Sequence, residues 1–170
     1  MRALVTAFVL TAAGGAAAET LHFSLSGGAG LAHGLAGLKI EGRYGPAAAF
    51  AGLGLGWGIR PAGGIRYYFA NGESGAGFVS LEYAYSNESY YDRSCCEYYD
   101  DTYHNFGAVL GYRFRFAHGF LELGIGPAWT LLHEKGVPGV GVAYDGTRVT
   151  FGHSGYNGFP DFDLALGFEF

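Results

Sequence analysis

The chain has 170 residues, of which 31 are Gly and 17% are aromatic, whereas only 15% are charged. Its formal net charge of −5 and the lack of a basic stripe exclude a nucleic-acid footprint. After the first residues, no window offers the roughly 18 consecutive apolar residues of a transmembrane helix. Strands that cross a membrane stay open as an interpretation, because they carry only the weaker signal of roughly ten-residue alternating segments.

The first 18 residues have the layout of a secretory signal peptide. Arg2 precedes an uncharged apolar stretch at positions 3–13, and small residues follow up to Ala18. The apolar stretch is shorter than the roughly 20 residues that a membrane-spanning helix needs. We expect cleavage after Ala18, which leaves residues 19–170 as one domain. The alternative is a short buried helix.

Eight later segments alternate between large apolar residues and small or polar residues. They cover residues 21–30, 36–44, 49–59, 64–70, 77–86, 103–116, 120–133 and 159–170. Successive side chains of a strand point to opposite faces, so each segment has one apolar face and one polar or glycine-lined face. In the third segment, for example, Leu53 and Leu55 alternate with Gly52 and Gly54. Where these segments carry charges, the charges fall on the polar face.

Such alternation is typical both of a soluble β-sandwich and of a membrane β-barrel. A sandwich would turn polar residues, not glycines, toward water, whereas inward glycines make room in a narrow barrel. Together with the signal peptide, this pattern favours the barrel. We predict an all-β fold, namely a transmembrane antiparallel up-and-down β-barrel of eight strands.

The connections between the segments are of two kinds. Short turns with Gly, Pro or Asn are expected at residues 44–48, 71–76 and 117–119, and long outer loops at residues 87–102 and 134–158. Short turns on one side and longer loops on the other are typical of outer-membrane barrels. Aromatic girdles are expected at the two interfaces, with Trp57, Tyr85 and Trp129 in one and Tyr44, Phe69, Phe116 and Phe170 in the other.

Residues 140–151 form a possible extra hairpin around Asp145-Gly146, a type I′ turn signal. The hairpin either extends the last outer loop as a β-arm or adds two membrane strands to make ten. Each limb has only about six residues, short of the roughly 9–11 that a membrane strand needs. We therefore favour eight strands.

The inward charges of the predicted barrel form a candidate lumen network. Its members are Lys39, Glu41, Arg43, Arg66, Glu82, Arg113, Arg115, Glu122, Asp161, Asp163 and Glu169. Side chains fill the interior of an eight-stranded barrel, and an unpaired buried charge is costly. We expect opposite charges to pair into a polar plug. A selective ion or proton path is the alternative.

The outer loop at residues 87–102 is the candidate recognition segment. The candidate binding residues are Tyr90, Tyr91, Cys95, Cys96, Tyr98, Tyr99, Asp100 and Asp101. Tyrosine offers rigid contact area with a polar tip. The adjacent cysteines could form a vicinal disulfide or pair with another chain in an oxidising compartment. A hydrated surface loop, and carboxylates that hold Ca²⁺ against lipopolysaccharide, are the alternatives; a zinc site would need more ligands.

The last segment carries a resemblance to a known family. Phe162, Leu164, Leu166, Phe168 and Phe170 alternate with small and acidic residues. The segment resembles the final strand of outer-membrane β-barrel proteins, and the whole chain resembles the small OmpA-, OmpX- and OmpW-type barrels. The resemblance implies a monomer in a bacterial outer membrane, in contact with outer-membrane lipids and lipopolysaccharide. It also implies that Phe168 and Phe170 belong to a signal read by the barrel-assembly machinery.

A catalytic interpretation rests on His153-Ser154. Residues 120–126 are similar to a segment of outer-membrane lipid A deacylases, small barrels that use a His-x-Ser-Asn stretch. Here His153 and Ser154 are adjacent, so in a strand they point to opposite faces, and no Asn follows. We therefore predict no catalytic, cofactor or metal site. The expected function is a structural or binding barrel that recognises a surface ligand or host partner, with a narrow pore for small solutes as the alternative.

Overall fold

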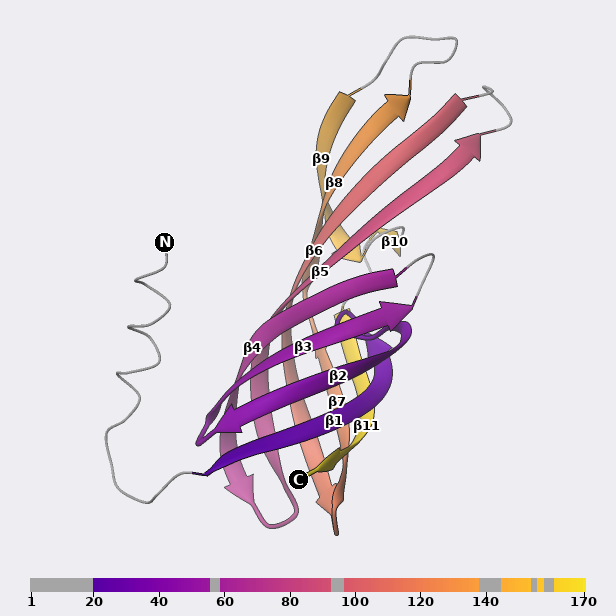
Figure 1. Cartoon of the computed structure of the whole chain (residues 1–170). Helices are drawn as coiled ribbons and strands as arrows, with labels where there is room; N and C mark the ends of the chain where they lie inside the picture. Colours follow the sequence, from indigo (N-terminus) through magenta and orange to yellow (C-terminus); the bar gives the residue numbers. More distant parts are fainter. Residues whose placement is uncertain (1–19, 56–58, 93–96, 138–144, 154–155, 158–160) are drawn as a thin grey trace, which may run out of the picture.

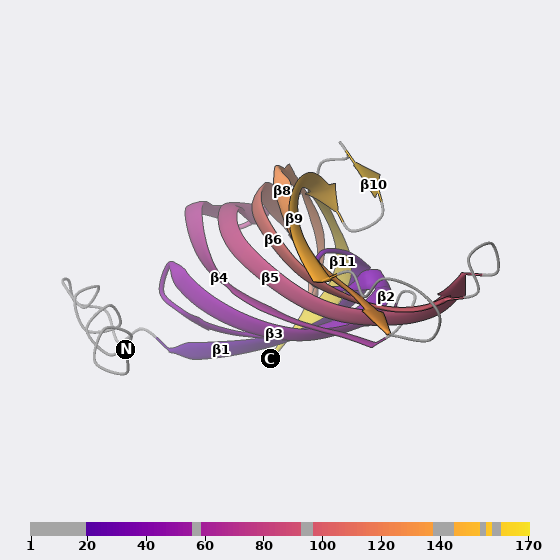
Figure 2. The same cartoon turned by 90° about the horizontal axis from the view of Figure 1, so that it is seen from above.

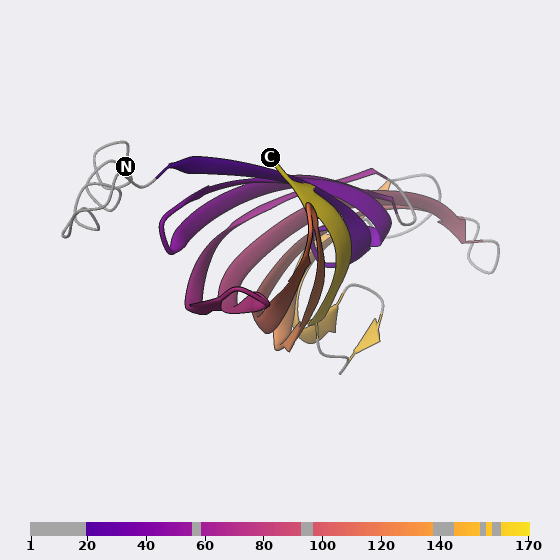
Figure 3. The same ribbon diagram turned by 90° about the horizontal axis from the view of Figure 1, so that it is seen from below.

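Eight antiparallel strands close into a barrel in the computed structural model, which describes residues 20–55, 59–92, 97–137, 145–153, 156–157 and 161–170 (Figure 1). The barrel strands are β1 (Leu21–Gly30), β2 (Gly34–Tyr44), β3 (Ala47–Leu55), β4 (Ile59–Gly72), β5 (Gly75–Asp92), β6 (Glu97–Phe116), β7 (Gly119–Gly126) and β11 (Asp161–Glu169). β11 closes the ring by pairing with β1 and β7. Viewed from above and below, the strands curve round a common axis (Figures 2 and 3). The predicted eight-stranded up-and-down barrel is confirmed.

The side chains alternate between an apolar outer face and a polar inner face. Leu53, Ile65 and Leu110 are 59%, 57% and 60% exposed on the outside, whereas Lys39 and Glu122 are 1% and 0% exposed inside. The outer face continues round the ring through Leu25, Leu38, Leu81, Leu123, Leu164 and Leu166. This burial is the reverse of that in a soluble β-sandwich, which buries its large apolar side chains and exposes its charges.

The segment predicted as one strand at residues 120–133 is interrupted at Pro127, which separates β7 from β8 (Ala128–Val137). Proline has no N–H to give to a ladder, so a strand that contains it is broken or bulged there. The two pieces nevertheless continue along the same neighbour. β7 pairs with β6 from Phe116 to Leu110, and β8 pairs with β6 from Gly107 to Tyr98.

Four strands continue beyond the barrel as a sheet, which we call the projecting sheet (Figure 1). It consists of residues 85–92 of β5, residues 97–104 of β6, β8 and β9 (Asp145–His153), and the short β10 (Tyr156–Asn157) pairs with the end of β9. The prediction of long loops at residues 87–102 and 134–158 was therefore wrong over most of their length. The backbone N–H and C=O groups of these polar, Tyr-rich segments are paired in cross-strand ladders. Composition alone does not indicate this pairing.

The extra hairpin extends the barrel as an arm and adds no barrel strand, as favoured. Its turn, however, was misplaced. Asp145 and Gly146 lie within β9 and pair with Lys135 and Glu134 of β8. The third segment was also too long at residues 49–59, because Leu55 and Ile59 are register partners on β3 and β4. The apolar alternation simply runs on from one strand into the next.

The barrel has two different ends. Short connections at residues 45–46, 73–74 and 117–118 lie at one end, which we call the turn end, as predicted. The N-terminal part of β1 lies at the same end, where Phe23 and Phe170 exchange backbone hydrogen bonds of 3.1 and 2.9 Å. The projecting sheet leaves the opposite end, which we call the projecting end (Figure 1).

Candidate functional site

Ionisable side chains from six strands meet inside the barrel in what we call the central charge cluster. Its members are Lys39 and Glu41 of β2, Arg66 of β4, Glu82 of β5, Arg113 of β6, Glu122 of β7 and Asp163 of β11. None of them is more than 4% exposed. Because the pleat turns alternate residues inward, one or two positions of each strand deliver their side chains to the same space.

Glu122 is the centre of the cluster. Its Oε2 lies 2.8 Å from Lys39 Nζ, and its Oε1 accepts hydrogen bonds of 2.7 Å from both Arg66 Nη1 and Arg113 Nε. Arg113 and Glu122 are also register partners on β6 and β7. One carboxylate therefore ties together three strands that are not consecutive in the barrel.

The other acids complete the pairing. Asp163 Oδ2 lies 2.9 Å from Arg66 Nη2 and 3.2 Å from Lys39 Nζ, so it shares two of the cations of Glu122. Arg113 Nη2 donates to Glu41 Oε1 at 2.7 Å, and the Tyr68 hydroxyl donates to the same oxygen at 2.8 Å. Charge-assisted hydrogen bonds of this length are the strong kind and fix the side chains in place.

Aromatic rings also line the lumen, and three of them were not among the residues predicted to face inward: Phe50, Phe78 and Phe120. The Arg66 guanidinium lies 3.9 Å from the ring centroid of Phe78, and that of Arg113 lies 4.1 Å from the ring centroid of Phe120. Residues two apart in a strand lie on the same face, so the inward position of Phe120 could have been predicted from Glu122. The cations are thus held by carboxylates and by the faces of rings.

The connection between β1 and β2 folds into the barrel. Leu31, Ala32 and His33 are at most 1% exposed. The Leu31 N–H donates to Asp161 Oδ1 at 3.2 Å, and His33 Nδ1 lies 3.4 Å from Asp163 Oδ1. We call residues 31–33 the inward turn. It explains where Asp161 lies: this carboxylate caps the turn and is not part of the central charge cluster.

The inward glycines of β3 make room for this turn. A Cβ atom on Gly52 would lie 2.6 Å from the carbonyl oxygen of Ala32, and one on Gly54 would lie 2.6 Å from the carbonyl carbon of His33. At contacts this close to backbone atoms, the backbone would have to shift to admit a side chain. Glycines that make room inside the barrel were predicted, and the chain itself occupies that room.

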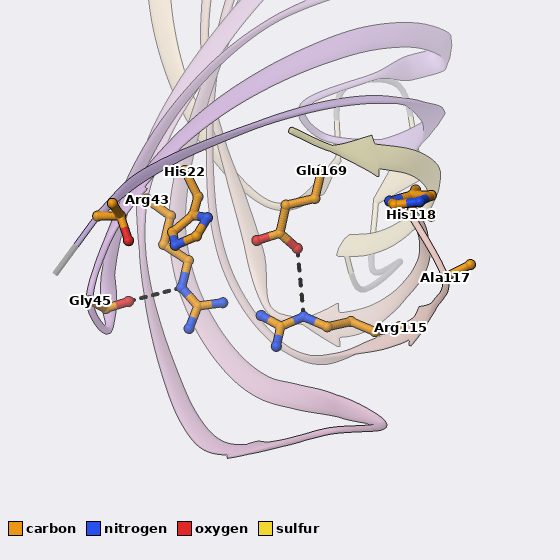
Figure 4. Close-up of a pocket in the computed structure, with 9 residues that line it drawn as sticks. His22, Arg43, Gly45, Arg115, Ala117, His118 and Glu169 are labelled. Atoms are coloured by element: carbon orange, nitrogen blue, oxygen red, sulfur yellow. Dashed lines mark hydrogen bonds and ion pairs between the residues drawn. The ribbon is translucent and has the colours of Figure 1, made fainter.

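Besides Asp161, three residues predicted for the lumen network lie apart from the central charge cluster. Arg43, Arg115 and Glu169 line a cavity of about 500 Å³ at the turn end, together with His22 and His118 (Figure 4). Its remaining wall is formed by Thr20, Gly45, Ala117 and Gly119. The lumen therefore contains two charged regions: the buried central charge cluster beside the inward turn, and this cavity at the turn end.

The candidate recognition residues lie at the tip of the β5–β6 hairpin. Tyr90 pairs with Tyr99, and Tyr91 pairs with Tyr98, so the four tyrosines stand as two neighbouring cross-strand pairs. Asp100 pairs with Ser89 next to them. Asp101 is 3% exposed and accepts a 3.2 Å hydrogen bond from Tyr103, so its carboxylate is not part of an open surface. Cys95 and Cys96 lie outside the described residues.

Phe168 and Phe170 face outward at the turn end, 63% and 73% exposed. His153 ends β9, where it pairs with Tyr156, and Ser154 lies outside the described residues. Across the described ranges, no group of three or more His, Cys, Asp or Glu side chains is arranged to hold a metal ion. No helix in the described part of the chain is long and apolar enough to cross a membrane.

Comparison of the chain with models of known protein families, with curated proteins and with solved structures found no match. The fold and the geometry of the lumen are therefore the basis for assigning a function.

Proposed function

We propose that the protein is a non-conducting outer-membrane barrel that uses the projecting sheet to bind a partner outside the cell. The observation that carries this proposal is the inverted burial: leucines face out and ion pairs face in. The partner would be a surface ligand or a host molecule, and the barrel would serve as its scaffold.

Insertion into a bilayer is supported by the outer face. A soluble protein rarely exposes contiguous apolar patches larger than a few hundred Å², and here large apolar side chains surround the whole barrel. The strands also have the right length. β1, β2, β3 and β11 contain 10, 11, 9 and 9 residues, close to the roughly 9–11 that a tilted strand needs to cross the hydrocarbon core.

A lumen without steady conductance is supported by the central charge cluster. Lys39, Arg66 and Arg113 each reach a carboxylate across the interior within 3 Å, so the opposite walls are joined directly. The inward turn fills the lumen above them. An ion would have to break several buried pairs, each of which is expensive to break. These contacts favour a plug over the narrow pore.

Recognition by the projecting sheet is supported by its unpaired edge. Within the described residues, β5 pairs with β4 only as far as Ala84, so residues 85–92 have a partner strand on one side alone. An open strand edge is a template for strand addition by an extended peptide. Tyr90 and Tyr91 are register partners of Tyr99 and Tyr98 near the tip of the hairpin, and tyrosine is a residue type enriched in recognition surfaces.

Reconstitution into planar bilayers tests the proposal. Protein that runs as a folded, heat-modifiable band and is recovered in the bilayer should show no steady conductance, because the ion pairs close the lumen. Stable channel openings would favour the narrow pore instead. The same preparation should leave lipid A unchanged; release of an acyl chain, abolished by Ser154→Ala, would establish the hydrolase alternative.

A further inference from the structure

The cavity at the turn end has a composition unlike that of the rest of the lumen. Arg43 of β2 and Arg115 of β6 extend toward one another, and Glu169 of β11 reaches toward Arg115 (Figure 4). His22 and His118 complete a largely basic lining. In the central charge cluster acids outnumber bases, whereas here two guanidiniums share one carboxylate.

The protein holds both guanidiniums at the cavity wall, and a donor of Arg115 has no hydrogen bond. Arg43 is fixed by a 2.8 Å hydrogen bond from its Nε to the carbonyl of Gly45 and lies 4.3 Å from the ring centroid of Tyr68. Arg115 Nε is buried and makes no hydrogen bond; the nearest carboxylate oxygen, on Glu169, is 3.6 Å away, beyond hydrogen-bond distance. Arg43 and Arg115 carry like charges and extend toward one another, so an anion between them would offset their repulsion.

We propose that the turn-end cavity binds a phosphate group carried by a small organic molecule. Guanidinium forks match phosphate and carboxylate oxygens, and a tetrahedral phosphate offers oxygens to two forks in different planes. The cavity of about 500 Å³ lies within the range of small-molecule sites, so it takes a phosphate with a few attached atoms.

Two sources present this chemistry. One is a soluble phosphate ester that enters from the compartment at the turn end. The other is the headgroup of a phospholipid, since Tyr44 and Phe116 face outward beside the cavity, as interfacial residues do at headgroup level. The binding measured is the same in both cases, and the proposal does not depend on whether the projecting sheet binds a partner.

Titration calorimetry of the folded barrel in maltoside micelles, with glycerol 3-phosphate as the probe, tests the site. Arg115→Gln should weaken binding about tenfold or more, because it removes a charge-assisted fork. Arg115→Lys, which keeps the charge and loses the fork, should fall between. Glu169→Gln should bind several-fold more tightly, because it removes the competing acid.

Two variants serve as matched controls. Glu73→Gln removes an acid from the β4–β5 turn at the same end, and Lys135→Gln removes a base from β8 at the other end; neither residue lines the cavity. Both should bind as the parent does. Equal losses in Lys135→Gln and Arg115→Gln would reduce the effect to net charge and overturn the proposal.

Native mass spectrometry from micelles doped with phosphatidylglycerol distinguishes the sources. Retention of one lipid by the parent barrel, reduced in Arg115→Gln and accompanied by weak glycerol 3-phosphate binding, would identify the headgroup. Saturable glycerol 3-phosphate binding without lipid retention would identify the soluble ester. Absence of both, with a heat-modifiable barrel that shows it is folded, would overturn the proposal.

Discussion

At the scale of single residues, Glu122 is the side chain in the lumen whose loss should most reduce the folding stability of the barrel. It is fully buried, and Lys39, Arg66 and Arg113 all place donors within 2.8 Å of its oxygens. Buried ion pairs contribute little net stability when complete, yet removal of one partner leaves charges without compensation. Glu122 is one partner for three cations, so its loss is the most damaging single change in the cluster.

Glu122→Gln should lower the free energy of unfolding by about 3–5 kcal/mol, because an amide cannot compensate the buried cations. Urea titration of the folded barrel in micelles, followed by tryptophan fluorescence, measures the change. Glu169→Gln is the matched control. Its side chain is 25% exposed and makes an ion pair of 3.6 Å, so the expected change is within about 1 kcal/mol. A similar effect of both substitutions would mean that Glu122 does not organise the lumen.

At the scale of elements, the inward turn and β3 are complementary in shape. The turn lies against the backbone of Gly52 and Gly54, and Asp161 holds it through the N–H of Leu31. The sequence alone could not reveal this arrangement. Residues 31–33 look like an ordinary connection until the strands are registered, and only then do the glycines of β3 come to face them.

Gly54→Ala should therefore destabilise the barrel by about 1–3 kcal/mol, the usual cost of forcing extra volume into a packed interior. Gly42→Ala is the control, since a Cβ there would lie 3.5 Å from the side chain of Phe23, an ordinary contact. Its expected effect is within about 0.5 kcal/mol. The same urea titration measures both. Equal values for the two variants would argue against a tight fit of the inward turn.

Strand faces were predicted well and strand ends poorly, for a physical reason. The alternation has a period of two, so burial on one face fixes which residues point inward, as it does for Lys39 and Glu41. The same alternation runs on from Leu55 to Ile59, although these residues are partners in different strands. It also gives no sign that the Tyr-rich segment pairs with itself, because polar residues on both faces are typical of loops.

The β5–β6 hairpin should be separable from the barrel. Replacing residues 90–99 with Asn-Gly would join Ser89 to Asp100, which are already register partners, through a two-residue turn. The register pairs of β5 and β6 within the barrel, such as Ser80 with Val109, are distant from the replaced residues. We expect an unchanged unfolding midpoint and loss of partner binding. A barrel that fails to fold would show that the hairpin is structural.

At the scale of the whole molecule, the sequence identified the inward charges but not their depth. Arg113 and Arg115 both face the lumen, yet one joins Glu122 and the other lines the turn-end cavity. Their position along the strand separates them: Arg115 is next to the strand end at Phe116, and Arg43 is next to the end at Tyr44. A prediction that assigns each residue to a strand face, but not to a position along the barrel axis, therefore merges two sites into one network.

In the proposed function, the leucine-lined outer face lies in lipid while the charged face is buried inside the barrel. Nitroxide labels on Leu53→Cys and Leu110→Cys, in a background with Cys95→Ser and Cys96→Ser, measure it in reconstituted vesicles. Collisions with oxygen should be frequent and collisions with a water-soluble nickel complex rare, because oxygen concentrates in hydrocarbon. A label on Asn87→Cys, exposed on the projecting sheet, should show the opposite pattern. Nickel collisions at Leu53 and Leu110 as frequent as those at Asn87 would contradict the account.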